Sequence, residues 1–183
     1  IYLTRVEAAD YLIQNGESQP LLVGVEHLAG NPNLEVVLDG DAECGAIAPE
    51  RLEELLVRVA SGEPVQYILG HWFFMGRKYF VDYGVLIPRD DTEVLVRECM
   101  TLFDKNDDIK ILDLCSGSGI IAITLQKHFE KAKVTAVEKS EIAYDFLLKN
   151  CSENNAVVEC LHGDLFDTYS NFADNSLDLI VSN

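Results

Sequence analysis

Three groups of residues have the types and spacing to carry chemistry. In the segment Asp113-Leu114-Cys115-Ser116-Gly117-Ser118-Gly119, an acidic residue precedes two glycines. Glu138 follows Gly119 by nineteen positions, and Asn183 follows the largely apolar segment 177–182. α/β sheets bind ligands at the carboxyl ends of their strands, so we expect the three groups to form parts of one active site.

The glycine segment predicts a ligand-binding turn between a strand and a helix. Glycines permit positive φ and close approach of the backbone, and the turn faces the positive end of the next helix. A carboxylate at Glu138 can accept both hydroxyls of a ribose, which suits S-adenosylmethionine or a dinucleotide. Residues 117–122 match GxGxxG/A, so NAD stays open, but Asp113 suits a cationic sulfonium better than a pyrophosphate. A tight turn without a ligand is the alternative.

Other candidates flank these groups. Asp164 could accept a hydrogen bond from the exocyclic amine of a base, and Leu165 or Phe166 could pack on its ring; an ordinary loop would explain them equally well. Arg89 could face the cleft. Asp90 and Glu93, three residues apart, predict a capping box at a helix start.

The predicted elements alternate after residue 88. Strands are expected at 109–114, 133–137, 157–161 and 177–182, and helices at 91–103, 119–129 and 140–150. This order predicts an α/β fold with a parallel, doubly wound, Rossmann-like sheet. Four strands make a small sheet of this type, so we expect further chain after Asn183.

The N-terminal part reads differently. Residues 1–69 are predicted to form a small helical domain, with helices after Thr4, over 20–28 and from Pro49 to about Ser61. Aromatic, β-prone residues then predict a hairpin linker over 70–87, and 88–183 forms the third segment.

The composition of the chain argues against several classes of function. The net charge is −17, which argues against a broad grip on nucleic acid. No apolar run is long enough for a membrane span. The five cysteines include no CxxC, so we expect reduced thiols, a cytoplasmic protein and no metal site.

Four segments together carry a resemblance to one family. Gly62-Glu63-Pro64-Val65-Gln66-Tyr67-Ile68-Leu69-Gly70 resembles its linker, and Val85-Leu86-Ile87-Pro88-Arg89-Asp90-Asp91-Thr92-Glu93 resembles its IPRxDTE segment. The glycine loop and Ser182-Asn183 resemble its cofactor loop and the start of its NPPY motif. The family is the release factor glutamine methyltransferases (PrmC/HemK).

The resemblance implies a helical domain that binds the release factor, a hairpin connection and an S-adenosylmethionine-dependent methyltransferase domain. It implies the cofactor at Cys115, Ser116, Gly117, Ser118 and Gly119, the ribose on Glu138, and adenine near Asp164 and Leu165. Asn183 would border the cofactor and accept an N–H bond from the substrate amide. The family usually has Gly at position 115, so Cys115 is strained if its φ is positive, and it often has Trp at position 165.

The expected function is methyl transfer to the side-chain amide nitrogen of a glutamine in a peptide chain release factor. The alternatives are an RNA or DNA amino-methyltransferase, and a nucleotide-cofactor or protein-binding module without turnover. We expect the 183-residue chain alone to be inactive or poorly folded, because no Pro-Pro-Tyr follows Asn183.

Overall fold

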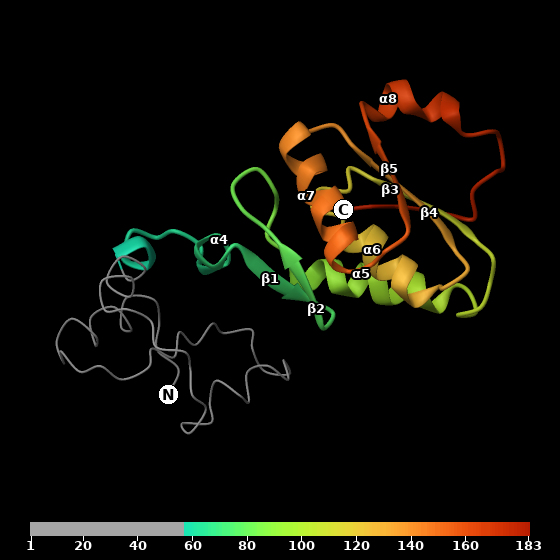
Figure 1. Ribbon diagram of the computed structural model, residues 1–183. Coiled ribbons are helices and arrows are strands. Elements are labelled where there is room, and N and C mark those ends of the chain that lie inside the picture. Colours follow the sequence, from blue (N-terminus) through green and yellow to red (C-terminus); the bar gives the residue numbers. More distant parts are fainter. Residues whose placement is uncertain (1–56) are drawn as a thin grey trace. The chain divides into compact units, whose positions relative to one another are not determined.

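The computed structural model describes residues 57–183, and the chain divides into two compact units between Ile68 and Leu69 (Figure 1). The helices predicted after Thr4 and over 20–28 lie outside the described residues, as does the start of the helix predicted from Pro49. Residues 57–60 are helical, and the positive φ of Gly62 follows them. The short helix α4 (Val65–Leu69) comes next.

A four-stranded parallel sheet forms the centre of the second unit. It contains β3 (Lys110–Leu114), β4 (Lys133–Glu138), β5 (Val158–His162) and β6 (Leu179–Ser182), in the spatial order β5-β4-β3-β6. The predicted α/β class and parallel sheet are confirmed. Since the strands are parallel, all four carboxyl ends meet at one edge, where the predicted site residues lie.

Helices cover the sheet on the side that carries the core. They are α5 (Asp90–Thr101), α6 (Ile120–His128) and α7 (Glu141–Glu153), and Figure 1 shows them grouped together, with α8 (Leu165–Thr168) apart from them at the top. The core is built from β-branched and aliphatic strand residues such as Ile111 and Val134, which are neighbours in register, and from Ile123 and Leu125 of α6. Runs of buried apolar residues are typical of strands inside parallel sheets.

The predicted hairpin is present, and its aromatic side chains enter the core of this unit. Strands β1 (His71–Phe74) and β2 (Arg77–Phe80) pair antiparallel, and the turn residues Met75 and Gly76 both have positive φ. Such two-residue turns match the twist of the strands they join. Tyr79 is fully buried and its hydroxyl lies 2.8 Å from Thr124 Oγ1 on α6.

The predicted capping box at the start of α5 is wrong. The N-cap position is Arg89, without a side-chain cap bond. Glu93 points elsewhere: one carboxylate oxygen accepts the N–H of Met75 at 3.0 Å, and the other pairs with Arg97. The carboxylate therefore holds the hairpin turn on α5, and this long-range contact outweighs the local cap.

Two further differences from the predicted elements lie at the end of α7 and just after β5. Helix α7 runs to Glu153, three residues beyond the expected end, and the Asn154 amide caps it by bonding the Asn150 carbonyl at 3.0 Å. Helix α8 and the 3-10 turn Tyr169–Asn171 occupy a segment that the sequence predicts to be a loop. Four helical residues are too few to produce a visible apolar period.

Asn150 ties the hairpin to the glycine loop. Its side chain is fully buried on α7; the oxygen accepts the N–H of Phe80 at 2.7 Å, and the amide donates to the carbonyls of Phe80 (3.1 Å) and Ser118 (2.9 Å). One side chain thus satisfies three backbone groups from two segments that lie far apart in the sequence.

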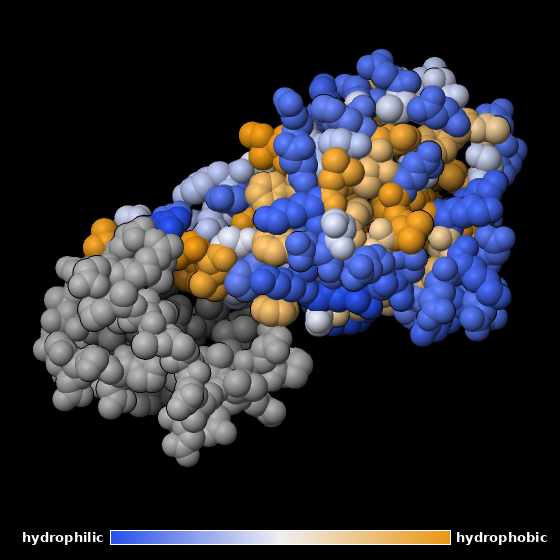
Figure 2. Space-filling model, viewed as in Figure 1, coloured by the Kyte–Doolittle hydropathy of each residue, from blue (hydrophilic) through white to orange (hydrophobic). Residues whose placement is uncertain are grey.

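The surface of this unit mixes polar and apolar residues. Figure 2 shows hydrophilic residues interleaved with apolar areas on one face. The large apolar side chains of the unit with the highest exposed fraction are Val157, Phe166, Leu86 and Tyr169. None of the helices in residues 57–183 has both the length and the apolarity that crossing a bilayer requires.

Replacing Asn150 by Ala should lower the free energy of unfolding by about 2–4 kcal/mol, because three backbone groups lose their buried partner. Asn154→Ala, at the partly exposed end of the same helix, is the comparison variant; within the described residues its amide bonds only the Lys78 and Asn150 carbonyls, so the loss should be smaller, about 1 kcal/mol. Urea denaturation followed by circular dichroism measures both. Equal losses in the two variants would contradict the bridging role of Asn150.

Candidate functional site

A cavity lies at the carboxyl edge of the sheet, where β3 and β6 end. Its empty volume is about 410 Å3, including space open to solvent. Three segments line it: the residues before α5 together with its first turn, the loop between β3 and α6 with the start of α6, and the residue that follows β6. The lining residues are Leu86, Ile87, Pro88, Arg89, Thr92, Cys115, Ser116, Gly117, Ser118, Ile120, Ile121 and Asn183.

The loop between β3 and α6 is wound through left-handed conformations. Cys115, Gly117 and Gly119 have φ of 57°, 54° and 84°. A Cβ on Gly117 would meet no atom within 4 Å, so the loop is open there, whereas one on Gly119 would lie 2.5 Å from Leu147 Cδ1. Glycine is thus needed for conformation at 117, and for conformation and close helix packing at 119. The positive φ of Cys115 confirms the strain expected for a residue other than glycine at this position.

Glu138, the last residue of β4, holds the loop. One carboxylate oxygen accepts the N–H of Gly117 at 2.8 Å and the other accepts the N–H of Ser140 at 2.8 Å. The side chain is mostly buried and is not among the residues that line the cavity. Each carboxylate oxygen can accept a second hydrogen bond, so Glu138 keeps acceptor capacity for a ligand.

Asp113 is turned away from the cavity. It is fully buried, and Oδ2 accepts the N–H of Ala122 in the first turn of α6 at 3.1 Å. Oδ1 has no hydrogen-bond partner within the described residues. Desolvation raises the pKa of the Asp113 carboxyl to about 7. The expectation that this carboxylate faces a sulfonium is wrong in its geometry, because the side chain holds the start of α6 instead.

Asp164 and Leu165 lie outside the cavity lining. Asp164 is the N-cap of α8: Oδ1 accepts the N–H of Phe166 at 2.8 Å and Oδ2 pairs with Lys139 at 2.8 Å. The Lys139 ammonium holds the pKa of this carboxyl below its usual range. Both residues therefore have local structural partners, and Leu165 begins the short helix.

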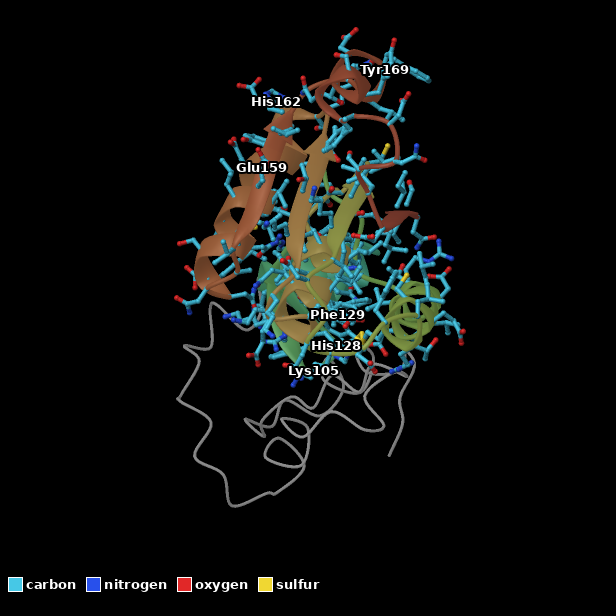
Figure 3. The ribbon with its side chains drawn as sticks, turned by 90° about the vertical axis from the view of Figure 1, so that its right-hand side faces the viewer. Lys105, His128, Phe129, Glu159, His162 and Tyr169 are labelled. Atoms are coloured by element: carbon cyan, nitrogen blue, oxygen red, sulfur yellow. The ribbon has the colours of Figure 1, made fainter. Side chains whose placement is uncertain are left out.

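His162 has a structural environment. Its ring stacks on Tyr144 with centroids 4.8 Å apart, and Nε2 lies 3.2 Å from the carbonyl oxygen of Lys139. Figure 3 shows His162 toward the end of the sheet that leads to Tyr169, with His128 and Phe129 at the opposite end. His162 does not line the cavity.

Asn183 and Arg89 both line the cavity, as their assignment as site residues requires. The Asn183 amide nitrogen donates to Thr92 Oγ1 at 2.6 Å. Arg89 is occupied by Asp91, with its guanidinium 2.5 Å from Oδ2. The exposed Asn183 side chain therefore has one end fixed on α5 and its oxygen available.

The site predicted from the sequence lacks Thr92, Pro88 and the apolar residues before Pro88, which all line the cavity. The resemblance to the IPRxDTE segment was the available signal, but it did not say which of its residues meet Asn183, 91 positions away. Within residues 57–183, no group of three or more His, Cys, Asp or Glu side chains is placed to hold a metal ion.

The buried Asp113 predicts a specific pH dependence of stability. Its folded-state pKa of about 7 lies above the ordinary value of 3.8, so the folded protein keeps a proton that the unfolded chain releases. The stability linked to this proton is full below about pH 4 and is lost as the pH rises through 7. In urea titrations from pH 4 to 8, Asp113→Asn should remove this decline.

Asp164→Asn is the control, since the lowered pKa of that carboxyl affects stability only at more acidic pH. A decline that persists unchanged in Asp113→Asn would show that another group causes it.

Comparison with known proteins adds two family matches. Residues 90–183 match the methyltransferase small domain, and residues 6–70 match the PrmC N-terminal domain. A release factor glutamine methyltransferase of Koribacter versatilis is 38% identical over 143 residues, covering 78% of this chain and 50% of the relative. The release factor glutamine methyltransferase of Fusobacterium nucleatum is 34% identical, and the match covers 97% of this chain and 51% of that relative. The chain thus spans about half the length of these curated relatives.

Solved structures agree with the fold. TYW2 of M. jannaschii, in complex with AdoMet, has a TM-score of 0.50 at 20% identity, covering 60% of this chain and 48% of that one. TYW2 of P. horikoshii, in complex with MeSAdo, has a TM-score of 0.50 at 20% identity, covering 73% and 56%. At this identity the likeness concerns the fold alone.

These matches confirm the resemblance that the four sequence segments carry. The glycine loop, the carboxylate that holds it and the asparagine at the end of β6 all lie in the part that matches the methyltransferase model. The chain belongs to the methyltransferase small domain family, and its residues 6–70 match the model of the PrmC N-terminal domain.

Proposed function

We propose that the protein transfers a methyl group from S-adenosylmethionine to the side-chain amide nitrogen of a glutamine in a peptide chain release factor. The observation that carries this proposal is the Asn183 carboxamide, which lines one cavity together with the glycine loop. Relatives named release factor glutamine methyltransferases support the choice of substrate.

The residues at the loop fit the proposed cofactor. The cavity is open at Gly117, where no atom would meet a Cβ, so the backbone is free to lie against a ligand. Glu138 lies behind the loop at Gly117, fixed by two backbone N–H groups, and has acceptor capacity left for a ribose hydroxyl. We assign Cys115, Ser116, Gly117, Ser118 and Gly119 to the cofactor loop. S-adenosylmethionine would supply the methyl group from its sulfonium.

Asp164 and Leu165 remain the proposed neighbours of adenine, although, unlike the glycine loop, they do not line the cavity. Asp164 already accepts two hydrogen bonds, and a third from an exocyclic amine would use a remaining lone pair. Leu165 offers apolar contact without the flat surface of an aromatic ring.

The proposed chemistry at Asn183 is positioning. A carboxamide nitrogen is a weak nucleophile because its lone pair is delocalised into the carbonyl. The free oxygen of Asn183 would accept one N–H of the substrate amide and fix the direction of its nitrogen, a contribution of orientation and polarisation. Arg89, at the same cavity, would contact the substrate from the side of α5.

The proposal includes a release factor as partner and a cytoplasmic location. The negative charge of the chain suits a protein partner better than nucleic acid. Cys99, Cys115, Cys151 and Cys160 are all free thiols, as in a reducing compartment. A nucleic acid amino-methyltransferase is the second candidate because an Asn at this strand end would serve a base amine equally well.

Labelled S-adenosylmethionine tests the function directly. The chain is assayed as given and within the longest polypeptide that contains it, with a release factor, tRNA and DNA as separate acceptors. We expect label on a release factor glutamine, located by peptide mass spectrometry, and a rate about 100-fold lower in Asn183→Ala. Label in nucleic acid alone would replace this proposal by the second candidate.

Glu138→Gln should weaken binding of S-adenosylhomocysteine by about 10- to 100-fold, because charge-assisted hydrogen bonds to the ribose become neutral ones. The matched control is Glu159→Gln on the adjacent strand, whose carboxylate accepts from Thr135 Oγ1 instead of from the glycine loop. Calorimetry measures the affinities, and thermal melts check that each variant is folded. Equal affinity in Glu138→Gln and the parent would remove the ribose assignment.

A further inference from the structure

We propose that Thr92 is a positioning residue that sets the orientation of the Asn183 carboxamide, with Asp91 behind it. This inference rests on the proposed function, in which the Asn183 oxygen accepts an N–H of the substrate. An Asn side chain can present either its oxygen or its nitrogen, so something has to choose between the two.

The choice is made by the hydroxyl of Thr92. Thr92 is buried in the first turn of α5, with 3% of its surface exposed, and its Oγ1 lies 2.6 Å from Asn183 Nδ2. A hydroxyl that accepts this bond fixes the nitrogen against α5 and leaves the carboxamide oxygen toward the cavity. The exposure of Asn183 keeps that oxygen accessible.

A hydroxyl can also donate, and donation would turn the carboxamide the other way. Asp91 removes that option: its Oδ1 lies 3.4 Å from Thr92 Oγ1 and is the acceptor for the hydroxyl proton. The contact is long, but the carboxylate is charged and its Oδ2 is fixed by the Arg89 guanidinium at 2.5 Å. With the proton directed to Asp91, the Thr92 oxygen presents a lone pair to Asn183.

The result is a chain of hydrogen bonds that leads from Arg89 through Asp91 and Thr92 to Asn183. Three of its members lie in four consecutive residues at the start of α5, and the fourth ends β6. Arg89 and Thr92 line the cavity, and residues 89–92 therefore also determine which atom of Asn183 faces the substrate. A substrate amide N–H needs an acceptor, so the opposite orientation would put donor against donor.

The test uses the longest polypeptide that contains the chain, with three variants. Thr92→Val keeps the shape and removes the hydroxyl; Thr92→Ser keeps the hydroxyl. Thr101→Val makes the same change near the other end of α5, where the exposed hydroxyl bonds only the Glu98 carbonyl among the described residues. Methyl transfer gives kcat and KM, and calorimetry gives the affinity for S-adenosylhomocysteine.

For Thr92→Val we expect kcat to fall by about 10- to 100-fold, the cost of a misplaced reacting group. The affinity for S-adenosylhomocysteine and the KM for the release factor should stay within about threefold. Thr92→Ser should restore most of kcat, and Thr101→Val should match the parent. Asp91→Ala should lower kcat less than Thr92→Val and should add nothing in the Thr92→Val background, because Asp91 acts through Thr92.

A second readout does not depend on activity. With 15N-labelled asparagine, the Asn183 side-chain amide in the parent should show one hydrogen-bonded, slowly exchanging N–H, which is lost in Thr92→Val and kept in Thr92→Ser. Thr92→Val that leaves both kcat and this amide signal unchanged would overturn the inference. A parent protein that shows the bonded amide but methylates no release factor would instead overturn the proposed function and leave the hydrogen bond standing.

Discussion

The carboxylate of Glu138 is the interaction on which the rest of the site depends. It ends β4, yet its two oxygens bind backbone N–H groups of the neighbouring glycine loop and of the turn into α7. Removing water from a carboxylate is costly unless its oxygens find donors, and these two N–H groups provide them. The loop between β3 and α6 thus takes its shape from the next strand, not from its own residues alone.

The same loop is held from its other side by Asn150. That amide bonds the Ser118 carbonyl and both backbone polar groups of Phe80. Because the hairpin is anchored on α5 by Glu93 as well, a contiguous set of polar contacts links the hairpin, α5, α7 and the glycine loop. The apolar core beneath supplies the bulk of the stability, while these few polar side chains decide the relative placement of the segments around the cavity.

The sequence predicted the parts of the fold that depend on local pattern. The strands around Ile111 and Val134 are apolar runs of the right length, and the hairpin is marked by its aromatic residues and Gly76. The predictions that failed depended on distant partners. Glu93 looked like half of a capping box, but it satisfies Met75 across the fold. Asp113 looked like a ligand-facing acid because its burial by α6 cannot be read from spacing.

The candidate site divides in the same way. Gly117, Gly119 and Asn183 were recognisable from their residue types at strand ends, and the resemblance to a family joined them. Thr92 was not, since the meaning of a threonine in the first turn of a helix is set by its neighbours in space. The buried, bridging position of Asn150 could not be predicted either, because an asparagine within a helix pattern is ordinarily exposed.

Cys115 gives this cavity a property that glycine at the same position would not. Its thiol is exposed on a lining residue, whereas Cys99 and Cys151 are buried. An electrophile small enough to enter the cavity meets a sulfur there before it reaches the buried ones. The residue that strains the loop thereby gives the cavity a thiol that glycine at the same position could not supply.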